Sequence, residues 1–257
     1  MSQRVKRANK RLPLKLLNIE NGKTPKGEKR GYLTGILYLS PAATSGVMNV
    51  CPCSSAGCRA ACLNTAGLAT MFPRILKARI AKTKWLHDDR EGFLAQLRAD
   101  ILALKRAAER WHMIPTVRIN GTSDLPQLAQ QMAQEFPHIQ FYDYTKIPQP
   151  WKRVRPNYHL TFSLSESNFQ EAWDALEHGI NVAVVFNTRK SRELPETWRG
   201  LRVLDGDVSD LRFLDTPQAK LGSIIGLRAK GRARKERGRG QRTGFVQIAP
   251  LPLFPES

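Results

Sequence analysis

Strand-like and helix-like segments alternate along this sequence, and only a few folds accommodate that alternation. Residues 32–39 are rich in strand-forming side chains, and four later stretches share this character: 116–120, 139–145, 159–164 and 182–186. Repeated strand-then-helix units favour a parallel sheet with its helices packed outside. The sequence therefore predicts an α/β fold, either a parallel sheet with helices outside or a partial (β/α) barrel.

Helices are expected between these strands. From Pro73 onward the chain has helical character, and its clearest helix spaces apolar residues three to four apart. Those apolar residues are Phe93, Leu94, Leu97, Ile101 and Leu104. Asp124 is placed to cap a further helix that runs to about Glu135. Two more strands are predicted at 201–204 and 223–227, with short or absent helices between them.

A capping signal also marks the helix that follows residue 164. Ser167 and Gln170 have capping-box spacing at its start, and Gly179 is placed to end it after Glu177. The next predicted strand, at 182–186, follows directly.

All four cysteines lie within one short loop after the first predicted strand, at Cys51, Cys53, Cys58 and Cys62. In a reducing compartment, close cysteines are more often metal ligands than disulfides, because thiolates bind soft and borderline metals. Cys51, Cys58 and Cys62 form the preferred ligand set. Cys53 is a possible ligand whose alternative is a nearby spare thiol. The loop is therefore predicted to be a metal site.

Two metal chemistries remain open for this loop. Structural zinc takes four tetrahedral ligands, usually from two separated pairs, and no second pair is present here. An iron-sulfur cluster is larger, so one loop can supply thiolates to three irons and leave the fourth iron open. The spacing favours a 4Fe-4S cluster, with zinc as the alternative. No His-Glu-x-x-His motif occurs, which disfavours a histidine-metal hydrolase. No Walker-type phosphate loop occurs either.

Polar residues follow each predicted strand. In a parallel α/β fold, the loops at the carboxyl ends of the strands build the site. The cysteine loop and the later polar segments are therefore expected to converge on one mouth. The candidate site residues expected at this mouth are Asn120, Gly121, Thr122, Ser123, Asp124, Thr145, Lys146, Ser163, Ser165 and Asn187.

Basic residues are concentrated towards both ends of the sequence. Residues 1–30 hold ten Lys or Arg against two Glu, and residues 228–242 hold eight against one, so these segments supply most of the net charge of +19. Basic segments bind polyanions because neutralised phosphates release counterions. Nucleic acid, with DNA favoured, is the expected partner, and a role in solubility alone is the alternative. The predicted contacts are Arg228, Lys230, Arg232, Arg234, Lys235, Arg237, Arg239 and Arg242.

The sequence divides into three parts. A basic arm covers 1–30, an α/β core covers 31–227 and carries the cysteine loop at 51–62, and a basic segment and tail cover 228–257. No stretch approaches the roughly 18 consecutive apolar residues of a membrane-spanning helix. The basic N-terminus is followed by no apolar segment, which argues against secretion. A cytoplasmic protein without membrane contact is expected.

Several of these motifs together resemble the phage gene product 88 family. They are Cys51-Pro52, Cys58, Cys62-Leu63, Arg118-Ile119-Asn120, Tyr142-Asp143-Tyr144-Thr145-Lys146 and Ser163-Leu164-Ser165, within roughly residues 31–190. Their order is also similar to that of radical S-adenosylmethionine (radical SAM) enzymes. In those enzymes, a three-cysteine loop after the first barrel strand holds a 4Fe-4S cluster. The resemblance implies a phage protein that works in the infected bacterial host.

The similarity to radical SAM enzymes also implies roles for individual residues. The three preferred cysteines would hold three irons, and the open iron would chelate S-adenosylmethionine. Asp124 would accept a hydrogen bond from the amino group of that cofactor. Other polar groups of the cofactor would meet Ser163, Ser165 and Asn187. The ten candidate residues at the mouth would thus be its cofactor-binding residues.

Two functional hypotheses follow. The first is a radical SAM-like iron-sulfur enzyme that acts on nucleic acid or a nucleotide-linked substrate, as in phage DNA base modification, and that needs an electron donor. The second is a non-catalytic nucleic-acid-binding protein with a structural zinc in the cysteine loop.

Overall fold

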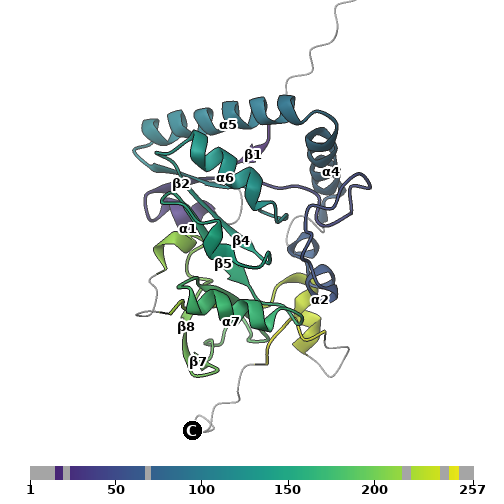
Figure 1. Cartoon of the computed structure of the whole chain (residues 1–257), viewed down its shortest axis with the longest axis vertical. Coiled ribbons are helices and arrows are strands. Elements are labelled where there is room, and N and C mark those ends of the chain that lie inside the picture. The colour runs from purple at the N-terminus through teal and green to yellow at the C-terminus, as the bar shows by residue number, and fades with distance from the viewer. Residues whose placement is uncertain (1–14, 20–23, 67–70, 216–220, 238–242, 249–257) are drawn as a thin grey trace, which may run out of the picture.

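The computed structural model describes residues 15–19, 24–66, 71–215, 221–237 and 243–248, which fold as a mixed α/β protein (Figure 1). The strands are β1 Leu17–Asn18, β2 Tyr32–Leu37, β3 Ile114–Arg118, β4 Gln140–Thr145, β5 Tyr158–Ser163, β6 Val182–Phe186, β7 Thr197–Trp198, β8 Leu201–Asp205 and β9 Ile224–Arg228. The α-helices are α1 Thr24–Glu28, α2 Ala56–Ala60, α4 Pro73–Asp88, α5 Arg90–Arg110, α6 Pro126–Glu135 and α7 Phe169–Glu177. The 3-10 helices are η1 Leu63–Thr65, η2 Pro150–Lys152, η3 Arg212–Leu214 and η4 Gly231–Arg237.

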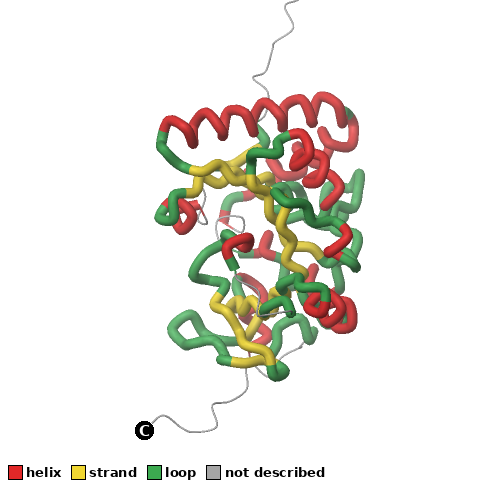
Figure 2. The backbone as a smooth tube through the Cα atoms, turned by 60° about the vertical axis from the view of Figure 1, so that its left-hand side comes forward, coloured by secondary structure: helices red, strands yellow, loops and turns green. Residues whose placement is uncertain are grey.

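Within the described residues, nine strands form one sheet in the order β1-β2-β3-β4-β5-β6-β9-β8-β7. Neighbours from β2 through to β8 run parallel, whereas the two-residue strands β1 and β7 pair antiparallel at the edges. From β2 to β6 the spatial order follows the chain order. Because crossovers between parallel strands are right-handed, this order places the connecting helices on one face. Figure 2 shows the strands as a band through the molecule with the long helices outside it.

The helix-covered face of the sheet is apolar. Helix α5 contacts β2 and β3, α6 contacts β4 and β5, and α7 contacts β5 and β6. Val117, Phe141 and Phe162 point from three of these strands into this layer and are fully buried. The five apolar residues predicted as the buried stripe of α5 are all buried there, which confirms that prediction.

The opposite face of the sheet is polar and aromatic. Thr34 and Thr116 lie side by side on β2 and β3 and share a hydrogen bond of 2.8 Å. On β4, the ring of Tyr142 lies 5.5 Å from the ring of Phe213 in η3. Strands of parallel sheets are usually apolar on both faces. The face away from the helices, the inner face of the sheet, is polar and so departs from that rule. Such departures occur mainly at functional sites.

All seven strands predicted from the sequence are present, with ends shifted by at most two residues. The largest shift is in β3, which begins at Ile114 and contains Pro115 near its start, a position in a strand where proline is tolerated. Gly179 ends α7 with a positive φ of 74°, as predicted.

Two predicted helix caps are wrong. The N-cap residues of α6 and α7 are Leu125 and Asn168, and neither makes a side-chain cap hydrogen bond. Helix α6 opens with Pro126, which lacks an N–H and already has a helical φ, so Asp124 is not needed as a cap. Ser167 likewise precedes the N-cap of α7 instead of occupying it.

Candidate functional site

The first anchor of the cysteine loop is the loop that follows β3. The backbone N–H of Asp124 donates a 2.7 Å hydrogen bond to the carbonyl of Val50. The Cys51 sulfur accepts from the N–H of Ala42 at 3.3 Å and lies 3.7 Å from the carbonyl oxygen of Thr122, to which its thiol donates. Cys51 is therefore fixed beside the residues that follow β3.

The second anchor is the loop that follows β5. Ser55 caps α2 by accepting a 3.0 Å hydrogen bond from the N–H of Cys58. Glu166 accepts hydrogen bonds from the Ser55 hydroxyl at 2.8 Å and from the N–H of Gly57 at 2.6 Å. A carboxylate is favourable at the start of a helix, where backbone N–H groups lack partners. These contacts tie the middle of the cysteine loop to the carboxyl end of β5.

A cavity of about 310 Å³ lies where these loops meet the carboxyl ends of the parallel strands. Three cysteines, Cys51, Cys58 and Cys62, line its wall, together with residues that follow β3 and β4 and the last residue of β5. Cys53 is exposed and is not part of the wall. All four cysteines of the chain are free thiols. The structure thus brings together the three cysteines that the sequence favoured as ligands.

Burial keeps two of these thiols protonated. It raises the pKa of Cys51 to about 11 and also raises the pKa of Cys62, and mutual repulsion among the thiolates adds to both shifts. A bound cation would reverse this effect, because a metal stabilises the thiolate. In the part of the chain that the structure describes, no three or more His, Cys, Asp or Glu side chains are grouped to hold a single metal ion.

Eight of the ten predicted cofactor-binding residues line the cavity: Asn120, Gly121, Thr122, Ser123, Asp124, Thr145, Lys146 and Ser163. The Lys146 ammonium donates to the Ser163 hydroxyl at 2.6 Å. One carboxylate oxygen of Asp124 accepts from the N–H of Lys146 at 2.7 Å, and its Oδ1 has no hydrogen-bond partner among the described residues. Burial raises the pKa of Asp124. A buried carboxylate oxygen that lacks a partner can accept a hydrogen bond from a ligand bound in the cavity.

The other two predicted residues lie away from the cavity wall. The N–H of Ser165 donates to the Asn168 side chain at 2.7 Å, within the turn that leads into α7. The N–H of Asn187 donates to the carbonyl of Gln247 at 3.0 Å, next to the bridge that joins β6 to the C-terminal segment. These contacts hold the backbone and do not bring either side chain to the site.

Sequence reasoning missed a second part of the cavity wall. Arg118 lies there, 3% exposed, with its guanidinium 4.8 Å from the Tyr144 ring centroid and its Nη1 2.9 Å from Asp210. Lys26, Gly206, Asp207, Ser209 and Asp210 complete this wall. The available signal was the alternation of β3, which places Arg118 on the same face as Thr116. The loop from 206 to 210 carries no comparable motif.

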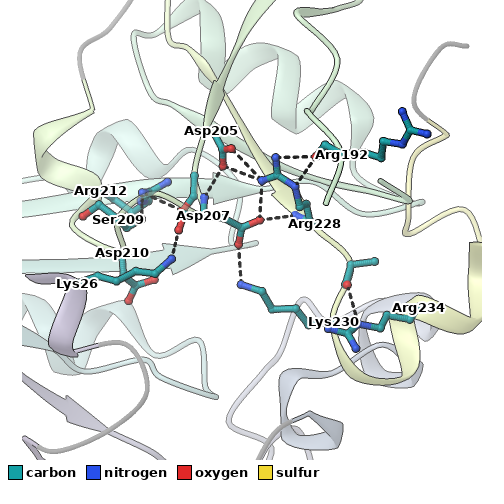
Figure 3. A network of polar contacts seen from close by, with 12 residues as sticks. Lys26, Arg192, Asp205, Asp207, Ser209, Asp210, Arg212, Arg228, Lys230 and Arg234 are labelled. Atoms are coloured by element: carbon teal, nitrogen blue, oxygen red, sulfur yellow. Dashed lines mark hydrogen bonds and ion pairs between the residues drawn. The ribbon is translucent and has the colours of Figure 1, made fainter. Parts of the chain in front are cut away.

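The basic C-terminal segment divides into two groups. Arg228 donates to Asp205 and Asp207, and Lys230 donates to Asp207 at 2.7 Å, so both belong to an internal ion-pair network (Figure 3). Arg232, Arg234 and Lys235 are exposed on η4. The side chain of Arg237 and all of Arg239 and Arg242 lie outside the described residues.

Fold and site together define an α/β protein with a thiol-lined cavity at the carboxyl ends of its parallel strands. The model of the Gene product 88 family matches residues 5–247, so the chain belongs to this family of phage proteins. No curated protein and no solved structure shows significant similarity to it. Among its described helices, none is long and apolar enough to cross a membrane.

Proposed function

We propose that this protein is a radical SAM-like enzyme whose Cys51, Cys58 and Cys62 hold a 4Fe-4S cluster. The observation that carries the proposal is the position of the three thiols. They come from one loop and line one cavity at the carboxyl ends of sequentially ordered parallel strands. That order, with helices on one face and a polar inner face, supports a partial (β/α) barrel.

The donor set fits a cluster better than a single ion. Sulfurs that share one tetrahedral zinc lie on the order of 4 Å apart, and no such group of three exists among the described side chains. Three thiolates and one open iron match the three cysteines on the wall. Cys53 is left out of the set because it is exposed.

The neighbouring residues fit S-adenosylmethionine. The unpartnered Oδ1 of Asp124 supports its role as acceptor for the cofactor amino group. Lys146 and Ser163, already hydrogen-bonded to each other, are donors for its carboxylate and hydroxyl groups. When bound and reduced, the cluster would supply the electron that cleaves the sulfonium of the cofactor.

A nucleic-acid or nucleotide-linked substrate, as in DNA base modification, is part of the proposal. Helix η4, which carries the exposed cations, packs against η1, just after the cysteine loop. The N–H of Arg232 lies 3.4 Å from the Thr65 hydroxyl, and Gly231 is packed so closely on Thr65 that a Cβ there would lie 2.7 Å from its carbonyl oxygen. A polyanion on Arg232, Arg234 and Lys235 would therefore lie near the cavity.

The test begins with metal content. Protein purified and reconstituted without oxygen is expected to be brown, with broad absorbance near about 400 nm and close to four irons per chain. Cys58→Ala is expected to lose most of the iron, whereas Cys53→Ala, the matched control, retains it. Stoichiometric zinc in colourless protein would support the alternative, a non-catalytic nucleic-acid-binding protein with structural zinc.

Cleavage of the cofactor is the second stage. Reduced with dithionite, the wild type and Cys53→Ala are expected to convert S-adenosylmethionine to 5′-deoxyadenosine and methionine. Cys58→Ala should not, and Asp124→Asn should bind the cofactor more weakly because it loses the charge on the acceptor. Cleavage that persists in Cys58→Ala would reject the enzyme hypothesis.

A further inference from the structure

A second part of the cavity wall has no role in the proposed chemistry of the cluster. It is formed by the inner face of β3 and by the loop after β8, and it carries the cavity-lining cations Lys26, Arg118, Arg228 and Lys230. We infer that Arg118, Lys26 and Lys230 form a phosphate-binding site, which holds the phosphate of the substrate while its reacting part faces the thiols.

Arg118 is the centre of this site. It is almost fully buried, and its Nε has no hydrogen-bond partner within the described residues. Burial alone would lower its pKa, but Asp210 and nearby tyrosines raise it on balance, so the guanidinium stays charged. Its charge is paired with Asp210 through Nη1, but the Nε donor is left over, and a buried donor without an acceptor is costly unless a ligand supplies one. Guanidinium groups bind phosphate through parallel hydrogen bonds.

Asp207 brings two lysines to the same wall. Lys26 donates to the Asp207 carbonyl, and Lys230 donates to its carboxylate (Figure 3). Each ammonium has three N–H donors, and its bond to Asp207 uses one of them. Arg228, by contrast, directs its guanidinium to Asp205, Asp207 and the Arg192 carbonyl. Lys26 and Lys230 therefore keep donors for a ligand, whereas Arg228 positions Asp207.

Phosphate suits this wall better than a carboxylate does. A phosphomonoester carries close to two negative charges and three acceptor oxygens. Three cations line the proposed site, and although Arg118 is paired with Asp210 and Lys230 with Asp207, together they offer one donor group to each phosphate oxygen. The inference deepens the proposed function and rests on it for the identity of the bound molecule as a substrate. Phosphate binding itself does not require the cluster, so a binding measurement and an iron measurement can fail independently.

The test uses the full chain, with adenosine 5′-monophosphate, adenosine and sodium acetate as probes at matched ionic strength. Calorimetry is expected to show binding of the monophosphate, with adenosine and acetate at least about tenfold weaker. Lys26→Ala and Lys230→Ala, both at exposed positions, should each weaken monophosphate binding about tenfold. Arg118→Lys should weaken it while retaining the charge, because lysine lacks the fork of donors.

Lys84→Ala is the matched control, since Lys84 is an exposed lysine of α4 that does not line this cavity. Its affinity should equal that of the wild type. The inference is overturned if adenosine binds as well as its monophosphate, if acetate competes equally, or if Lys84→Ala weakens binding as much as Lys230→Ala does. A 5′-phosphorylated oligonucleotide tested against the monophosphate identifies the source of the phosphate. In either case, binding must depend on Arg118.

Discussion

The carboxylate of Glu166 accepts a 2.6 Å hydrogen bond from the backbone N–H of Gly57, a residue 109 positions away in sequence. Its second oxygen accepts from the Ser55 hydroxyl. Through these two bonds the loop after β5 holds helix α2 in place. Because α2 carries Cys58, the bonds also keep Cys58 on the cavity wall.

Gly57→Ala should disturb this junction, because the new Cβ would lie 2.6 Å from both Glu166 Oε2 and Thr243 Oγ1. We expect a loss of about 1–3 kcal/mol in the free energy of unfolding, measured by urea titration. Iron uptake on reconstitution should also fall. Ala60→Ser, at an exposed position of the same helix, is the control and should change neither quantity.

Asp143→Asn should destabilise the loop that follows β3. Asp143 is buried and accepts hydrogen bonds from the N–H and Nδ2 of Asn120, at 2.7 and 2.9 Å, and from the Tyr158 hydroxyl at 3.3 Å. The amide NH2 group of an asparagine would face one of these N–H or O–H donors in place of a carboxylate oxygen. The lost hydrogen bond should cost about 1–3 kcal/mol. Urea unfolding measures the change. An equal change in Asp88→Asn, at an exposed position, would contradict this explanation.

Lys82 predicts a dependence of stability on pH. Burial lowers its pKa to about 8, a shift that Asp100 partly opposes, and its ammonium donates to the Leu16 carbonyl at 2.7 Å. Between pH 8 and about 10 the unfolded chain binds more protons than the folded one, so this residue increases stability as pH rises. The wild type should gain up to about 1.4 kcal/mol per pH unit relative to Lys82→Met.

The control for that measurement is Lys84→Met, which changes an exposed lysine of the same helix. Its unfolding free energy should follow that of the wild type from pH 7 to 10. A constant difference between the wild type and Lys82→Met over this range would show that Lys82 is not titrating there.

The exposed cations of η4 predict the salt dependence of DNA binding. Replacing Arg232, Arg234 and Lys235 with alanine should reduce the slope of log K against log salt by about 2 to 3 for duplex DNA. Fluorescence anisotropy at several salt concentrations measures this slope. A triple variant at Lys77, Lys84 and Arg90 removes the same charge from α4 and α5, and it should leave the slope nearly unchanged. Equal reductions would indicate attraction by net charge alone.

Much of the site could be predicted because loops at the carboxyl ends of parallel strands share one edge of the sheet. This geometry explains why residues after β2, β3 and β4, and the last residue of β5, line one cavity. It fails for Asn187, which follows β6 but does not line the cavity. Its backbone N–H is bonded to Gln247, 60 positions away, a contact that no local pattern reveals. Arg118 was not assigned to the site, although it lies in the Arg118-Ile119-Asn120 motif, because an arginine on a predicted strand is usually a surface residue.

The amino-acid sequence by itself determined the α/β class, the strand positions and the clustering of the cysteines, because these depend on local periodicity and spacing. Only the tertiary structure decided the strand order, with β9 between β6 and β8, and the polar inner face. It also decided that Lys230 belongs to the cavity wall and Arg232 to the surface. These features depend on which side chains, distant in sequence, are buried next to one another. A buried polar or charged group is stable only where such a distant neighbour pairs with it.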